Sequence, residues 1–133
     1  MQAFDMELIG TGVDIVDNRR IRRIHGRYPE AFAKRILHAN ELEEFSADPD
    51  KVLYLASRFS VKEAISKAFG LGMRGKMSWK NICITHDSLG KPVPDFEESL
   101  RSYLGVDALQ VSVSISHEQH YTIAYAIAFG KSP

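Results

Sequence analysis

The chain has 133 residues, a formal net charge of zero, 44% hydrophobic residues and 26% charged residues, so we expect one domain over residues 1–133. Without net charge there is no global field to gather polyanions, and electrostatic recognition must come from a local patch. The single cysteine, Cys83, excludes an internal disulfide and is typical of a reducing compartment. The first seven residues lack the positive charge of a signal peptide, and the apolar run 121–129 is about half the ~20 residues of a membrane span. We therefore predict a cytoplasmic protein without a membrane segment.

The N-terminal part predicts one strand followed by helical segments. A strand is expected over residues 7–15, which are rich in Gly, Val and Ile. Asn18 suits the N-cap of a helix over residues 18–27. A second helical segment is expected over residues 29–37, and an acidic turn over residues 40–45.

The strongest helix signal lies in the middle of the chain. Asp48 suits the N-cap, Pro49 the first helical position and Gly70 the C-terminal cap of a helix that runs from Pro49 to Phe69. Residues 70–76 contain three glycines, which predicts a loop.

Strands dominate the rest of the chain. Residues 109–116 alternate strictly between apolar and polar side chains, which predicts a half-buried strand. Residues 121–129 alternate too and would close an antiparallel hairpin with it. A strand, a short strand and a helix are expected over residues 79–86, 91–93 and 95–104. Because helices cluster early and strands late, the order favours an α+β fold with an antiparallel sheet.

Three charged residues are candidates for a phosphate-handling site. Glu63 and Lys67 would stand one turn apart on the same helix face, and Asp14 ends a strand in a distant segment. Taken separately, they read as a solvated acid and a surface ion pair worth ~0.3–0.5 kcal/mol. Taken together, two carboxylates and a cation suit magnesium and phosphate, because magnesium takes few protein oxygens and shares the rest with water and phosphates.

Two further features are candidate ligand contacts. His117 ends the alternating strand, although lone histidines are more often structural than catalytic. The sequence Ser116-His117-Glu118 does not make a hydrolase triad, because neighbouring side chains on a strand point to opposite faces. The turn Gly90-Lys91-Pro92 offers another cation in a fixed loop.

A run of positive charge occupies residues 19–35. It has seven basic residues against one acid, a net of +6: Arg19, Arg20, Arg22, Arg23, Arg27, Lys34 and Arg35 against Glu30. The run reads either as a solvated helix face or as a docking surface for an acidic partner, protein or nucleic acid. Only two aromatics occur in it, so stacking of single-stranded bases is not favoured.

The order and spacing of these segments are more specific than any one of them. The chain contains, in this order, Gly12-Val13-Asp14-Ile15, Arg58-Phe59, Lys62-Glu63-Ala64, Lys67-Ala68-Phe69-Gly70, Gly90-Lys91-Pro92 and Val113-Ser114-Ile115-Ser116-His117-Glu118. In this combination, which spans roughly Ile9 to Phe129, it resembles the bacterial holo-acyl-carrier-protein synthase family of 4′-phosphopantetheinyl transferases.

The resemblance implies a fold and a reaction. The family fold is α+β, with a long central helix packed on an antiparallel sheet, and its members usually form a homotrimer with active sites between subunits. The implied reaction transfers the 4′-phosphopantetheine of coenzyme A to a serine of apo acyl carrier protein and releases adenosine 3′,5′-bisphosphate, as a step of fatty acid biosynthesis.

The resemblance also implies roles for individual residues. Asp14 and Glu63 would bind Mg²⁺ and would form the catalytic set with Lys67, which would contact the phosphates. The residues implied to line or lie near the coenzyme A site are Arg58, Lys67, Gly70, Lys91, Pro92 and His117. Arg20 and Arg27 match the positive helix that meets the acidic recognition helix of the carrier protein.

Leu71 departs from the family pattern, and the role of general base is not assigned to any residue. Leu71 stands where the family usually has a threonine between two glycines, which could alter a hydroxyl contact near coenzyme A. The base that takes the serine proton is not identified by the sequence: Glu63, a metal-bound water and a carboxylate of the carrier are the candidates.

Three other functions compete with this one. A nucleic-acid-binding module would use the arginine run but would leave Asp14, Glu63 and Lys67 unexplained. A different magnesium-dependent phosphate enzyme is a second alternative, although no Gly-x-x-x-x-Gly-Lys-Ser/Thr loop occurs. A transferase for the carrier domains of large synthases is a third, but such enzymes are typically about twice this length. We therefore predict an acyl carrier protein partner and no nucleic-acid or membrane partner.

Overall fold

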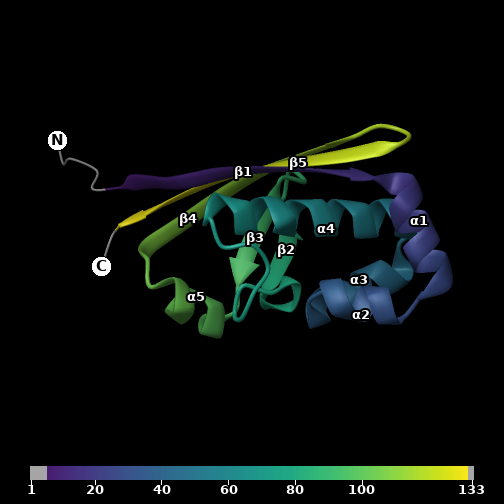
Figure 1. The fold of residues 1–133 in the computed structure, drawn as a ribbon, viewed down its shortest axis with the longest axis horizontal. Helices are drawn as coiled ribbons and strands as arrows, with labels where there is room; N and C mark the ends of the chain where they lie inside the picture. The colour runs from purple at the N-terminus through teal and green to yellow at the C-terminus, as the bar shows by residue number, and fades with distance from the viewer. Residues whose placement is uncertain (1–5, 132–133) are drawn as a thin grey trace.

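The computed structural model describes residues 6–131, which form three layers (Figure 1). The upper layer is an antiparallel sheet in the order β1 (Glu7–Asp17), β5 (Tyr121–Lys131), β4 (Asp107–His117). The helix α4 (Lys51–Ala68) runs beneath this sheet and forms the middle layer. The predicted α+β fold, with a long helix on an antiparallel sheet, is confirmed.

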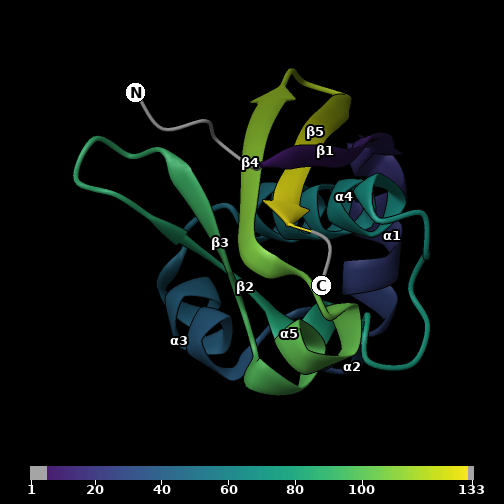
Figure 2. The same cartoon turned by 90° about the vertical axis from the view of Figure 1, so that its left-hand side faces the viewer.

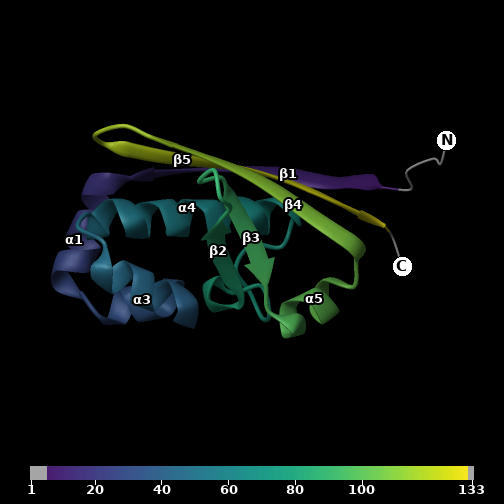
Figure 3. The ribbon, with the colours of Figure 1, turned by 180° about the vertical axis from the view of Figure 1, so that it is seen from behind.

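The remaining elements cover the lower side and one end of α4 (Figures 1 and 3). They are α1 (Asn18–Arg27), α2 (Ala31–Ile36), α3 (Ala39–Ala47), a 3-10 turn (Trp79–Asn81), β2 (Ile82–His86), β3 (Pro92–Phe96) and α5 (Glu98–Leu104). The two short strands pair with each other, and Figure 2 shows their hairpin extending to one side of the molecule. No helix within residues 6–131 is long and apolar enough to cross a membrane.

Two glycines let α4 approach β1 closely. A Cβ atom at Gly12 would lie 2.0 Å from the carbonyl oxygen of Ala64, and one at Gly10 would lie 2.1 Å from that of Ala68. Side chains alternate along a strand, so Asp14 is the next inward-facing position of β1 after Gly12. The close approach therefore brings Asp14 against α4.

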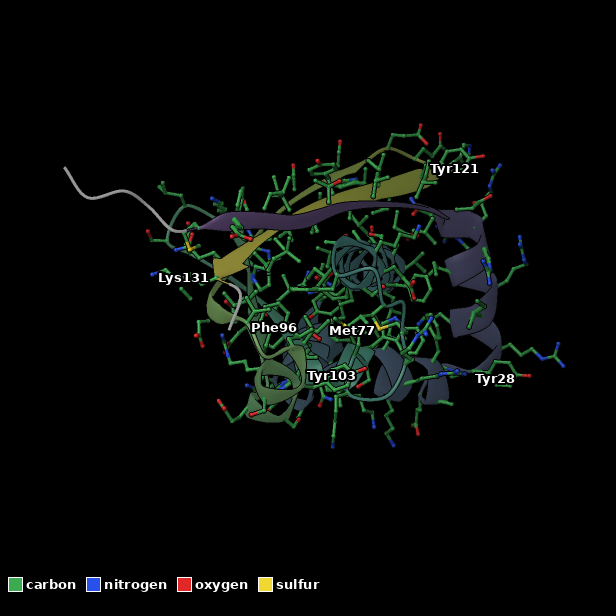
Figure 4. The ribbon with its side chains drawn as sticks, turned by 60° about the vertical axis from the view of Figure 1, so that its left-hand side comes forward. Tyr28, Met77, Phe96, Tyr103, Tyr121 and Lys131 are labelled. Carbon is green, nitrogen blue, oxygen red and sulfur yellow. The ribbon has the colours of Figure 1, made fainter. Side chains whose placement is uncertain are left out.

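The two faces of the three-stranded sheet differ. Toward α4 the central strand presents Ala124, Ala126 and Ala128, each at most 1% exposed. The other face carries large apolar side chains in the open: Val13, Ile15, Ile123 and Tyr125 are 50%, 63%, 42% and 45% exposed. Figure 4, in which α4 is seen end-on, shows side chains standing on this outer face, with Tyr121 near one end, while Met77 lies inside.

The structure corrects the expected acidic turn over residues 40–45. This segment belongs to α3, whose N-cap is His38, and Glu41 completes a capping box by accepting from the His38 backbone N–H at 2.8 Å. Glu41 and Phe45 are buried. One of the acids of this segment, Glu41, is the partner of the buried cations Lys62 and Arg58.

Several element boundaries also shift. Asp50 rather than Asp48 caps α4, accepting from the Leu53 N–H at 3.1 Å, and Asp17 rather than Asn18 caps α1. Asn18 is buried instead, and its side-chain amide donates to the Glu118 carbonyl at 3.3 Å. In each case the helix is capped by an acid one or two residues from the predicted cap residue, and the sequence alone did not distinguish the two candidates.

Candidate active site

Three charged side chains meet where α4 crosses β1. The Lys67 ammonium lies 3.2 Å from the Asp14 carboxylate and donates to the Val13 carbonyl oxygen at 3.0 Å. The Asp14 side chain is 15% exposed and that of Lys67 is 51% exposed. Glu63 precedes Lys67 by one turn of α4 and is half-buried. The structure thus brings together the three residues predicted to form the catalytic set, and Asp14 and Glu63 are called the carboxylate pair below.

The electrostatics of the carboxylate pair favour a bound cation. Burial is the main cause that raises the pKa of Glu63, and the nearby negative charge of Asp14 raises it further. The Trp79 indole and Lys67 act in the opposite direction. Two half-buried carboxylates that repel each other are relieved by a divalent ion. Among residues 6–131 no group of three or more His, Cys, Asp or Glu gathers as a metal site, but magnesium needs only one or two protein carboxylates when phosphates complete its shell. The donor set therefore fits magnesium.

A groove of about 410 Å³ opens between α1, α2 and α4. We call it the α1–α2 groove, and it is lined by Val16, Arg20, Ile21, Ile24, Tyr28, Ala31, Phe32, Arg35, Ile36, Phe59 and Trp79. Val16 follows Asp14 by two residues and so shares its strand face. Phe59 precedes Glu63 by one helical turn. The apolar groove therefore adjoins the carboxylates.

The two arginines predicted to meet the carrier protein lie on α1 and are exposed. Arg20 lines the α1–α2 groove. Arg27 lies near the end of the helix, where its guanidinium sits over the Tyr28 ring, 5.4 Å from the ring centroid. Both cations are thus on the helix that forms one wall of the groove.

Three residues predicted near coenzyme A lie on or beside β4, the strand at the opposite edge of the sheet from β1. Lys91 and Pro92 line a hollow together with residues 109–112 of β4. His117 ends β4 and lines another hollow. Because β1 and β4 are the opposite edges of the sheet, with β5 between them, two strand spacings, about 10 Å, separate the strand of Asp14 from that of His117.

Gly70 and Arg58 have different surroundings. Gly70 follows the end of α4 with φ of 70°, a conformation that glycine adopts readily, and it lies just beyond Lys67. Arg58 is buried, 3.0 Å from Glu44 and 3.4 Å from Glu41. Its guanidinium also lies 4.2 Å from the centre of the Tyr54 ring. The structure thus pairs Arg58 with acids of α3 and does not place it beside the carboxylate pair.

Sequence reasoning missed three residues near the site. Trp79 interacts with Glu63 and lines the α1–α2 groove, and its only signal was that it is the single tryptophan. Lys62 and Glu41 form a fully buried ion pair at 2.5 Å. A lysine in the middle of an otherwise apolar helix stripe was the available signal for that pair.

Comparisons with known proteins agree with this geometry. The model of the 4′-phosphopantetheinyl transferase superfamily matches residues 10–126. The holo-[acyl-carrier-protein] synthase of Neisseria meningitidis is 43% identical over 122 residues, which cover 91% of this chain and 98% of that protein.

Solved structures are similar as well. A crystal structure of the holo-[acyl-carrier-protein] synthase from Neisseria meningitidis has a TM-score of 0.86 at 42% identity, covering 92% of this chain and 98% of that one. The Helicobacter pylori enzyme, solved in complex with coenzyme A, has a TM-score of 0.78 at 29% identity, covering 89% and 98%. With the carboxylate pair and Lys67 in place on this fold, the chain belongs to the 4′-phosphopantetheinyl transferase superfamily.

Proposed function

We propose that this chain is a holo-[acyl-carrier-protein] synthase, which transfers 4′-phosphopantetheine from coenzyme A to a serine of apo acyl carrier protein. The observation that carries the proposal is the carboxylate pair beside Lys67, in a chain 43% identical to such a synthase over 91% of its length. The H. pylori relative was solved with coenzyme A bound, which supports coenzyme A as the donor.

The reaction is a substitution at phosphorus. The serine oxygen forms a bond to the β-phosphorus of coenzyme A, and the bond from that phosphorus to the oxygen bridging to the α-phosphate breaks. The serine loses its proton to a base, and adenosine 3′,5′-bisphosphate leaves with the bridging oxygen. Such transfers depend on positioning and on neutralising charge more than on covalent help from the protein.

The residues of the site suit these demands. Asp14 and Glu63 would hold Mg²⁺, which when bound would neutralise charge on the phosphoryl oxygens. Lys67 places a positive charge within 3.2 Å of Asp14, where it can stabilise the charge that develops on the leaving bisphosphate. The half-buried setting of Glu63 limits water around the reacting groups and strengthens these interactions.

The α1 helix is the proposed docking surface for the carrier protein. Arg20 and Arg27 are exposed there, within the run of net charge +6 over residues 19–35. An acidic helix of the carrier would be steered to this surface, and α1 also lines the apolar groove together with Val16 and Phe59, the neighbours of Asp14 and Glu63 on their strand and helix faces.

We further propose a homotrimer whose active sites lie between subunits. The outer sheet face exposes Val13, Ile15, Ile123 and Tyr125, which a second copy would bury. In the proposed trimer, a neighbouring subunit supplies Lys91, Pro92 and His117 to the carboxylate pair. Light scattering after gel filtration should give three times the chain mass, and a monomer would contradict this part.

The proposed location is the cytoplasm. The free thiol of Cys83 is buried, as expected where thiols stay reduced. Fractionation of cells that make the protein should recover it with cytoplasmic markers, and recovery with the envelope would contradict the assignment.

One experiment tests the reaction and the metal together. Apo acyl carrier protein is incubated with this protein, coenzyme A and magnesium, and its intact mass is measured with and without a chelator. We expect a gain of one phosphopantetheine that the chelator abolishes. No gain on a carrier that another synthase modifies would reject the proposed function, and a gain that survives chelation would reject the metal requirement.

A further inference from the structure

Lys62 is buried on the side of α4 that faces the lower layer. Its side chain is 0% exposed, and its ammonium donates to the Ile36 carbonyl oxygen at 2.8 Å, the Trp79 carbonyl oxygen at 3.0 Å and the Glu41 carboxylate at 2.5 Å. Three acceptors match the three N–H groups of a protonated lysine. Lys62 therefore joins α4 to α2, to α3 and to the turn that carries Trp79.

Glu41 extends these connections. Besides Lys62, its carboxylate accepts from the His38 backbone N–H at 2.8 Å and from the Ile84 backbone N–H at 3.0 Å, and the Arg58 guanidinium lies 3.4 Å away. A buried ion pair is rarely needed for stability, because an apolar pair of similar volume is often as stable. The pair is better explained by the parts of the backbone that it orients.

The segment that Lys62 holds contributes Trp79 to the lining of the α1–α2 groove. The Trp79 ring lies nearly parallel to the Phe59 ring, with the centroids 6.1 Å apart, and the Arg35 guanidinium is 5.7 Å from its centre. Its indole N–H has no acceptor in hydrogen-bond geometry within residues 6–131, but it stabilises the charged form of Glu63. Trp79 thus lines the groove and stacks on Phe59, which lies one turn of α4 before Glu63.

We propose that Lys62 is a positioning residue: through the Trp79 carbonyl and the Glu41 carboxylate it fixes Trp79 in the wall of the groove, against Phe59, and so sets where a docked carrier presents its serine. This inference rests on the proposed function for its kinetic consequence. Its structural part, that Lys62 holds Trp79 in place, does not depend on any activity.

The test compares three variants. Lys62→Met removes the ammonium but leaves Glu41 buried without its lysine partner, which can prevent folding. Glu41→Gln with Lys62→Met removes both charges and keeps an oxygen that can accept from the Ile84 N–H. Tyr54→Phe is the matched control, because it removes another buried hydrogen bond between α4 and α3, from the Tyr54 hydroxyl to the Glu41 carbonyl at 3.1 Å, without touching Trp79.

The fluorescence of Trp79 gives a direct measurement, because the chain has a single tryptophan. We expect the double variant to unfold cooperatively, with red-shifted emission and stronger quenching by acrylamide than the wild type. We expect its kcat for the carrier to fall about 10–100-fold, the effect of small misplacements near a reacting centre, with an unchanged KM for coenzyme A. Tyr54→Phe should match the wild type in emission and in kcat.

The outcomes separate the two proposals. If the wild type modifies no carrier, the proposed function fails, while the emission of the variants still shows whether Lys62 holds Trp79. If the double variant folds with wild-type emission, or with altered emission and wild-type kcat, Lys62 does not position the site and the inference is wrong. An equal fall of kcat in Tyr54→Phe would also reject it, because the effect would then follow from any loss in this part of the core.

Discussion

The Lys67 ammonium and the Asp14 carboxylate lie 3.2 Å apart although 53 positions separate them in the chain. Lys67 comes from the last turn of α4 and Asp14 from the middle of β1. The contact exists because the helix lies directly on the strand, and it places a cation beside the two carboxylates that would hold the metal.

Glu63→Gln should abolish transfer while the fold stays intact. The amide keeps the size of the side chain but loses the charge that a hard cation requires. We expect the initial rate of carrier modification to fall by a factor of about 100 or more, with an unchanged circular dichroism spectrum. The control is Glu43→Gln, which neutralises an exposed carboxylate of α3, and activity near the wild-type level in Glu63→Gln would reject the metal assignment.

The same variant should be more stable than the wild type at neutral pH when no metal is present. Burial and Asp14 raise the pKa of Glu63 above its ordinary value of 4.5, so the folded state binds more protons than the unfolded state. The free energy of unfolding therefore falls as pH rises through the interval between the two values. Urea titrations should show the advantage of Glu63→Gln at neutral pH, and the advantage should fade as pH falls below about 4.5. An advantage independent of pH would mean that the charge of Glu63 is not its cause.

Arg20→Glu should raise the KM for the carrier protein much more than it lowers kcat. A reversed charge on α1 repels an acidic partner, and the defect should depend steeply on salt because the residue is exposed. Lys131→Glu is the matched control, because it makes the same charge change at the end of β5, far from α1 (Figure 4). Equal KM values for the two variants would remove α1 from the docking surface.

Two inactive variants should restore activity when they are produced together. If sites lie between subunits, a chain with His117→Ala still supplies Glu63, and a chain with Glu63→Gln still supplies His117. Mixed trimers would contain some sites with both groups intact, so co-expression should give partial activity where each variant alone gives little. Failure of co-expressed chains to regain activity, with mixed trimers confirmed by mass, would place the whole site within one subunit.

Gly12→Ala should destabilise the fold and also reduce activity. Its Cβ would stand 2.0 Å from the Ala64 carbonyl oxygen, so β1 must move away from α4, at a cost of about 1–3 kcal/mol or more. Gly26→Ala, in α1, is the control, because an added Cβ there has no neighbouring atom within 4 Å. This substitution should stabilise the helix by about 0.5–1 kcal/mol. Thermal unfolding should show opposite shifts, and a Gly12→Ala protein as stable as the wild type would contradict the packing described above.

Much of this site could be predicted, because its residues belong to short sequence motifs on one helix and one strand. The helix periodicity placed Glu63 and Lys67 on one face, and the resemblance supplied Asp14 as their partner. The sequence could not reveal that Arg58 turns inward to Glu41 and Glu44, because a helix of mixed charge does not indicate which cations find buried partners.

The prediction of an acidic turn over residues 40–45 was wrong for the same reason. The role of this segment depends on Lys62, which lies 21 residues from Glu41 along the chain, and no local pattern encodes that contact. The separation of His117 from the carboxylate pair likewise depends on strand order. That order follows from the complete topology and not from any segment.

The contact between Gly12 and the Ala64 carbonyl has a consequence for how the sequence can vary. Main-chain atoms on both sides set the spacing between β1 and α4, so the distance between Asp14 and the helix does not depend on the size of any core side chain. Apolar substitutions elsewhere in the interior can then accumulate while the position of the carboxylate pair relative to β1 and α4 stays constant. Gly10 and Gly12 therefore set the spacing between the strand and the helix that carry the site, although neither has a functional group.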